Sequence, residues 1–152
     1  MYFSVRYMFF VSLAAAVSLL SISCGDTKTQ ECNQIIQVAN KVVSEANELT
    51  NGGQVSNPQM VIQTADAMKK ASQEMEAIEL KDKQLQNYQA GFVSMYRDTS
   101  QATRDFIIAS EKKDRQGAEI ASSKLQQATA SEKQLVTDIN TYCSTEVATE
   151  EQ

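Results

Sequence analysis

The sequence predicts an all-α protein, an up-down-up-down four-helix bundle with a disulfide joining the start of helix 1 to the end of helix 4. Three observations predict this fold. The chain has one proline and five glycines in 152 residues and is rich in the good helix formers Ala, Gln, Glu and Lys. Apolar residues recur at alternating steps of three and four in four successive segments, which is the period of an amphipathic helix. Two cysteines, Cys32 and Cys143, lie near the two ends of this pattern.

The first helix is expected over residues 29 to 50. Thr27 and Gln30 have the spacing of a capping box at its start, and the Asn-Gly-Gly sequence at 51 to 53 is typical of a helix end. Between these signals lies one apolar stripe, made of Cys32, Ile35, Ala39, Val42, Ala46 and Leu49.

The second helix is expected to begin at Pro58. Asn57 can accept hydrogen bonds from the free amides of the first turn, and proline lacks the amide hydrogen that would go unbonded there. At the far end Asp82 can cap a new helix, although no glycine or proline marks the boundary and the two helices could instead meet at a bend. The stripe of this second helix consists of Val61, Ala65, Met68, Ala71, Met75 and Ile78.

The third and fourth helices are expected on either side of Asp114, which can cap the fourth. The four helices together are expected to cover residues 29–144. The acidic segment 145–152 lacks periodicity and is predicted to be a disordered tail. The fourth stripe contains polar residues near Ser131, where a core position should lie. The third stripe is Leu85, Tyr88, Phe92, Met95, Thr99, Ala102, Phe106 and Ala109, and the fourth is Ala118, Ala121, Leu125, Ala128, Leu135, Ile139 and Tyr142.

The pairing of Cys32 with Cys143 follows from the number of helices. Short connections force neighbouring helices to be antiparallel, so an even count returns the end of the last helix to the start of the first. In a three-helix bundle the two cysteines would lie at opposite ends. The Cα atoms of a bonded pair should lie within about 7 Å, and the bridge would stabilise the fold by about 4–5 kcal/mol.

The N-terminal segment, residues 1–23, has the form of a secretory signal peptide that is removed. It carries a single charge at Arg6, an apolar stretch from Tyr7 to Ile22, and small residues before Cys24. A retained transmembrane anchor is the competing interpretation. The apolar stretch is short for a span, contains serines and lacks a basic residue on its far side, so export is favoured.

The run Ser21-Ile22-Ser23-Cys24, followed by Gly25, resembles the lipobox of bacterial lipoproteins. In that family the cysteine is acylated and becomes the first residue of the mature chain. The resemblance covers residues 1–25 and implies a lipid on Cys24, with residues 24–28 as a linker, on a protein that faces the periplasm or the extracellular side. Ser21 departs from the pattern, which favours Leu there, and ordinary cleavage after Ser23 is the alternative.

The number of cysteines fits the lipoprotein interpretation. An exported chain with three cysteines would keep one unpaired thiol in an oxidising compartment, unless one sulfur has other chemistry. Acylation of Cys24 would account for that sulfur. Cys32 and Cys143 would then remain to pair with each other.

The composition argues against several classes of function. The net charge is −5 and the basic residues are scattered, so we expect no nucleic-acid partner. Histidine is absent and no phosphate-binding loop occurs, so we expect no enzyme activity, metal or cofactor. Four glutamates are candidates by residue type for a carboxylate metal site but are better explained as solvated helix faces: Glu74, Glu76, Glu79 and Glu119.

Two places are candidates for contact with a partner. Tyr96 lies beside the third stripe rather than on it and is expected to be the most exposed aromatic residue; the other aromatics of the bundle are interpreted as core. Lys112 and Lys113 lie at the turn between the third and fourth helices, the end farthest from a lipid on Cys24. We therefore expect a non-catalytic, lipid-anchored helical module that binds or assembles with a protein partner. The alternative is an exported carrier that holds a small apolar ligand within the bundle.

Overall fold

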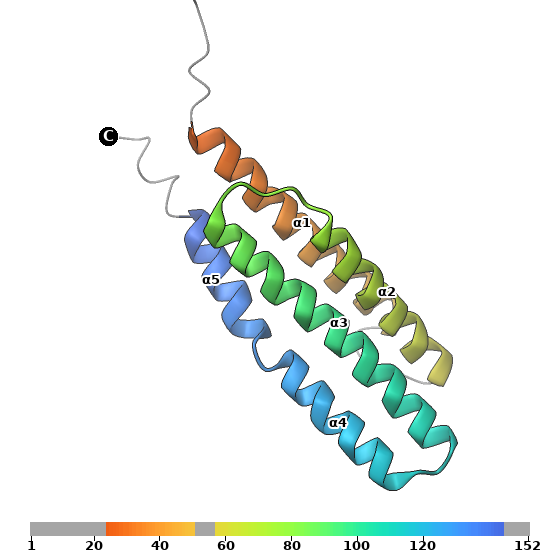
Figure 1. The fold of residues 1–152 in the computed structure, drawn as a ribbon. Helices are drawn as coiled ribbons and strands as arrows, with labels where there is room; N and C mark the ends of the chain where they lie inside the picture. The colour runs from red at the N-terminus through yellow and green to blue at the C-terminus, as the bar shows by residue number, and fades with distance from the viewer. Residues whose placement is uncertain (1–23, 51–56, 145–152) are drawn as a thin grey trace, which may run out of the picture.

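The computed structural model describes residues 24–50 and 57–144, and the regular structure within them is entirely α-helical (Figure 1). The predicted signal peptide, 1–23, and the predicted tail, 145–152, lie outside these residues. The helices are α1 (Cys24–Thr50), α2 (Pro58–Glu76), α3 (Lys83–Glu111), α4 (Arg115–Thr129) and α5 (Glu132–Ser144).

The helices form the predicted up-down-up-down bundle, in which α4 and α5 together make the fourth arm (Figure 1). The start of α1, the α2–α3 connection and the end of α5 lie at one end of the molecule. We call this the closed end, because the bond between Cys32 and Cys143 joins its first and last helices. The α3–α4 turn lies at the opposite end.

Three helices begin where the sequence predicts, each with an acidic or amide side chain as its cap. Asn57 accepts from the Met60 amide at 2.9 Å, Asp82 from the Leu85 amide at 2.8 Å, and Asp114 from the Gly117 amide at 3.0 Å. Each oxygen satisfies one of the amides that a first helical turn leaves unbonded. α2 and α3 are therefore separate helices and do not join at a bend.

The start of α1 differs from the prediction. The helix begins at Cys24 rather than at residue 29, so residues 24–28 are helical instead of a linker and Thr27 does not cap the helix. One contact that holds this extra turn is made by Lys28, whose ammonium lies 3.9 Å from the ring centroid of Tyr142 on α5. The sequence pattern of α1 alone does not predict that contact, because its other partner lies on α5.

The fourth arm also differs, because it is two helices and not one. α4 ends at Thr129, and α5 begins at Glu132. No large apolar residue lies between Leu125 and Leu135, so no large apolar side chain packs this stretch against the core. The Ser131 carbonyl accepts from the Leu135 amide at 2.9 Å and starts α5, and the acidic Glu132 suits the positive end of the new helix dipole.

The core is concentrated toward the closed end. Four large side chains are fully buried there: Ile35, Met75, Leu85 and Phe92. α2 and α3 approach each other through small residues, and the Ser100 hydroxyl donates to the Ala65 carbonyl at 2.7 Å. The four arms of the bundle are therefore packed against each other by apolar contacts at one end and by small residues along α2 and α3.

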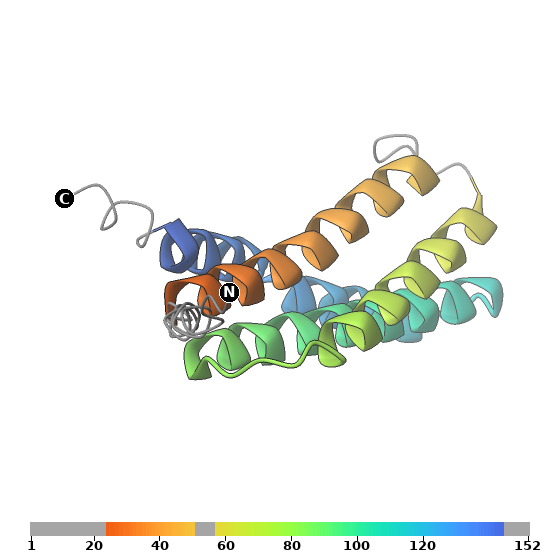
Figure 2. The same cartoon turned by 90° about the horizontal axis from the view of Figure 1, so that it is seen from above.

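Away from the closed end the bundle opens. Figure 2 shows α1 rising away from α3 and α4 toward Thr50. Phe106, predicted to be core, is 38% exposed in this half of α3, while its neighbour Ile107 is buried. Over the described residues, no helix combines the length and the apolar character needed to cross a bilayer.

Candidate functional site

The predicted disulfide is present and closes the bundle. Cys32 and Cys143 are joined with their Cα atoms 6.0 Å apart, and 111 positions separate them in the sequence. Cys32 is buried, at 3% exposure, because it lies in the first turns of α1 facing α5. Cys24 is the first residue of α1, and the structure describes its backbone only.

A network of polar and aromatic groups surrounds the disulfide. The Tyr142 hydroxyl donates to the Asp82 carboxylate at 2.9 Å, and the Tyr142 ring meets Tyr88 edge to face at 5.8 Å between centroids. Lys28 covers the Tyr142 ring from α1. Tyr142 therefore ties α5 to α1, to α3 and to the loop before α3.

The Asp82 carboxylate is stabilised in its charged form. Partial burial would by itself raise the pKa of Asp82, but the hydrogen bonds from the Leu85 amide and the Tyr142 hydroxyl, together with the nearby Lys28, outweigh it. The net effect is a pKa below the ordinary value for aspartate.

Glu31, which the sequence analysis did not single out, completes the closed end. It is an acidic residue only 5% exposed, and its two oxygens accept from the backbone amides of Lys81 at 3.1 Å and Asp82 at 3.0 Å. Gln89 supports the same loop by donating to the Met75 and Ile78 carbonyls, both at 2.8 Å. These long-range contacts hold the α2–α3 loop without a glycine or proline.

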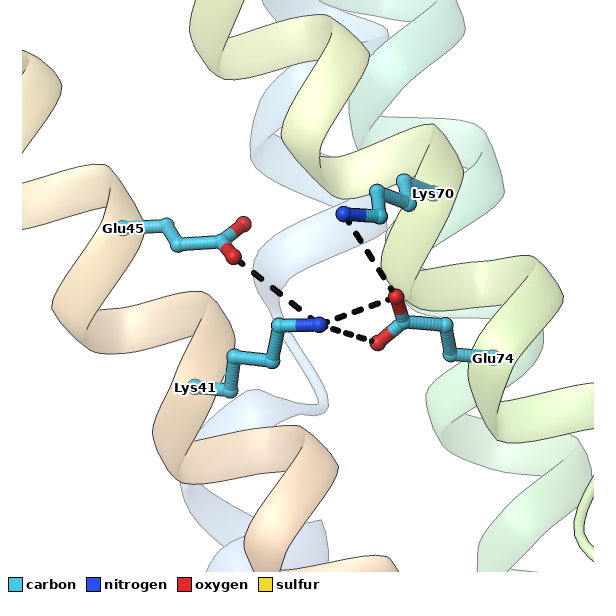
Figure 3. A network of polar contacts seen from close by, with 4 residues as sticks. All are labelled: Lys41, Glu45, Lys70 and Glu74. Atoms are coloured by element: carbon cyan, nitrogen blue, oxygen red, sulfur yellow. Dashed lines mark hydrogen bonds and ion pairs between the residues drawn. The ribbon is translucent and has the colours of Figure 1, made fainter.

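Glu74, one of the glutamates considered for a metal site, lies in an ion-pair network between α1 and α2 (Figure 3). The Lys41 ammonium lies between the carboxylates of Glu74, at 2.8 Å, and Glu45, at 4.0 Å, and Lys70 approaches Glu74 at 3.7 Å. The hydrogen bond from Lys41 lowers the pKa of Glu74 and raises the pKa of Lys41. Within the described part of the chain, no group of three or more Cys, Asp or Glu is placed to hold a metal ion.

Lys112 and Lys113 lie at the turn between α3 and α4, and both are exposed. Lys113 has φ of 57°, the left-handed conformation that favours glycine. The Asp114 amide donates back to the Ala109 carbonyl at 2.9 Å, and the Lys113 amide to the Ser110 carbonyl at 3.1 Å. This is the pattern of a Schellman motif, which satisfies the last carbonyls of α3.

The prediction that Tyr96 is exposed is wrong. Its side chain is 5% exposed and stacks on Phe92, with the ring centroids 5.9 Å apart. α5 covers this side of α3, so the residue beside the stripe is enclosed as well. Burial and the nearby Glu132 carboxylate raise the pKa of Tyr96 to about 12.

Tyr96 lies in the wall of a cavity between α1, α3 and α5, with a volume of about 130 Å³. Apolar side chains from all three helices line it, including Ile35, Met95 and Ile139. The remaining predicted residues are not brought together: the two lysines lie at the α3–α4 turn, and the disulfide lies at the closed end. The spacing of Phe92 and Tyr96 in the sequence places these two aromatic residues next to each other on one helix. No sequence pattern predicts the polar side chains at the cavity mouth, which come from α1 and α5.

The comparisons with known proteins assign no relative to this chain. No protein-family model, no curated protein sequence and no solved structure matches it.

Proposed function

We propose that this protein is a non-catalytic helical module, anchored by a lipid on Cys24 to the outer side of a bacterial membrane, that binds or assembles with a protein partner. One observation carries the proposal. Cys32 and Cys143 are bonded to each other, so neither is available to Cys24, the third cysteine of the chain. A disulfide also suits an oxidising compartment outside the cytoplasm.

The positions of the polar groups support a role in binding rather than catalysis. Glu31 and Asp82 are engaged with backbone amides, and Glu74 is paired with Lys41. These contacts hold helices together and leave little freedom for proton transfer. A membrane anchor before Cys32 would put the closed end near the membrane and the α3–α4 turn away from it.

Mass spectrometry of the mature N-terminus tests the anchor. We expect an acylated Cys24 as the first residue and a chain that fractionates with membranes. Cys24→Ser should release the protein from the membrane fraction while Cys32 and Cys143 stay bonded, which non-reducing electrophoresis can check. An unmodified Cys24, or a mature chain that keeps residues 1–23, would contradict the proposal.

A pull-down from membranes of the producing bacterium tests the partner surface. Charge reversal at Lys112 and Lys113 should weaken retention of a partner without changing the thermal midpoint, because both side chains are exposed. The matched control reverses Lys69 on α2 and Lys133 on α5, which are also exposed but lie away from the turn. Equal retention by the two double variants would exclude the turn as the contact surface.

A further inference from the structure

The cavity between α1, α3 and α5 is large enough for a small organic molecule. Its volume of about 130 Å³ is close to that of an engineered apolar cavity, about 150 Å³, that binds benzene. Its walls include Ile35, Phe92, Met95 and Ile139, all of which are buried. The cavity therefore favours a compact apolar body about the size of a six-membered ring.

The mouth of the cavity is open to solvent and includes exposed apolar side chains. Val43 on α1 is 53% exposed and Val136 on α5 is 41% exposed, and both line the cavity. They are two of the five large apolar side chains that are most exposed among the described residues. A ligand that entered between them would cover apolar surface that now faces water.

One polar group in the cavity wall makes no hydrogen bond to the protein. The Tyr96 hydroxyl belongs to a side chain that is 5% exposed, and within the described residues it makes no hydrogen bond. Among the described residues, Thr99 Oγ1 is the side-chain atom that is fully buried without a partner, so the Tyr96 hydroxyl oxygen keeps some access to solvent. A polar atom of a ligand in the cavity would supply the Tyr96 hydroxyl with a partner.

The negative charge of Glu132 at the mouth favours a ligand with a positively charged group. Glu132 lines the cavity and has no ion-pair partner in the described part of the chain, and no lysine or arginine lines the cavity with it. The other polar groups at the mouth are the amides of Asn40 and Asn140, which are neutral. An ammonium group can donate to all of these groups, whereas a carboxylate would be repelled by Glu132.

We propose that this cavity binds a small primary amine, with its apolar body between α1, α3 and α5 and its ammonium group between Glu132 and the Tyr96 hydroxyl. The Tyr96 phenol is neutral at physiological pH, as an ordinary tyrosine is, and its oxygen can accept from the ammonium. Burial and the nearby Glu132 raise the pKa of Tyr96 further, to about 12. This site is separate from Cys24 and from the α3–α4 turn. It does not depend on the lipid anchor.

Three probes with the same ring and different head groups test the proposal: benzylamine, benzyl alcohol and benzoate. Each is titrated into the purified protein while the methyl resonances of Met95, Val136 and Ile139 are followed by NMR. We expect saturable shifts with benzylamine, about fivefold weaker binding of benzyl alcohol because it lacks the charge, and the weakest binding of benzoate. Absence of binding by benzylamine, or equal binding of all three probes, would overturn the proposal.

Variants locate the site and its charge. Glu132→Gln should reduce the affinity for benzylamine to that for benzyl alcohol, whereas Glu119→Gln on α4, far from the cavity, should change neither. Ala39→Met should fill the cavity and abolish the shifts at an unchanged thermal midpoint. If that variant does not fold, Val136→Phe narrows the mouth from an exposed position and should have the same effect on binding. Full binding by Glu132→Gln, or by a folded cavity-filling variant, would show that the amine binds elsewhere.

Discussion

Glu31 and Asp82 are joined across 51 positions of the sequence, by a hydrogen bond of 3.0 Å from the Asp82 backbone amide to the Glu31 carboxylate. Asp82 in turn caps α3 and accepts from Tyr142 on α5. Two acidic residues therefore hold the α2–α3 loop at the closed end. Glu31 accepts hydrogen bonds from the backbone amides of the loop, and Asp82 is itself part of the loop.

Removing the Glu31 carboxylate should destabilise the protein by about 2–4 kcal/mol, because two backbone amides in a partly buried loop lose their acceptor. Urea unfolding of Glu31→Ala measures this, and Glu31→Gln, which keeps one acceptor oxygen, should lose less. Glu48→Ala, an exposed change on the same helix, should stay within about 0.5 kcal/mol of the parent protein. A loss for Glu31→Ala as small as that of the control would refute the role given to this carboxylate.

Asp82 should make the protein less stable in acid. Its pKa is lowered in the folded state, so the unfolded chain binds the proton more readily. The contribution to the free energy of unfolding is present above the unfolded pKa, about 3.9, and is lost as the pH falls through the folded value.

The variant Asp82→Asn keeps a side chain that can cap α3 but removes this titration. We expect it to be about 1 kcal/mol less stable than the parent protein at pH 7, with a difference that shrinks as the pH falls below about 4. Tyr142→Phe, which removes one donor to the carboxylate, should reproduce part of the difference. A difference in the free energy of unfolding between the parent protein and Asp82→Asn that does not change with pH would contradict this role of the Asp82 charge.

Reduction of the Cys32–Cys143 bond should lower the free energy of unfolding by about 4–5 kcal/mol, because the bond closes a loop spanning 111 positions. The double variant Cys32→Ser, Cys143→Ser should behave like the reduced protein in urea unfolding and should not respond to reductant. Its far-UV circular dichroism should remain helical if it folds. A loss below about 1 kcal/mol would mean that packing alone closes the bundle.

Lys113→Gly should stabilise the protein by about 0.5–1 kcal/mol, because glycine adopts the left-handed conformation found there without the steric cost of a side chain. Lys112→Gly is the matched control, since Lys112 has a helical φ of −78° and the charge change is the same. Glycine there should destabilise, by about 0.5–1 kcal/mol. Thermal unfolding compares the two, and equal midpoints would contradict the argument.

Much of the fold could be predicted from local signals in the sequence. Asn57, Asp82 and Asp114 mark helix starts because a cap depends only on neighbouring residues. The disulfide followed from the helix count, because topology alone brings Cys32 and Cys143 together.

The features that sequence reasoning missed depend on contacts between distant segments. Lys28 reaches Tyr142 across the bundle, and Glu31 reaches a loop from another helix. Tyr96 is buried because α5, which follows the break at Ser131, covers that side of α3. The helical period of α3 alone does not predict this contact. The polar mouth of the cavity was missed for the same reason, since Asn40 and Glu132 lie on helices that meet only in the fold.

The break between α4 and α5 divides the fourth arm into two parts that differ in how they are held. α5 carries Ile139 in the core and Cys143 in the disulfide, whereas Ala121 is the buried residue of α4. α4 should therefore open as a local unit. In hydrogen exchange its amides should lose protection first, while those of α5 exchange only when the whole molecule unfolds. Opening of α4 at Ser131 would then be faster and more frequent than any opening of the closed end.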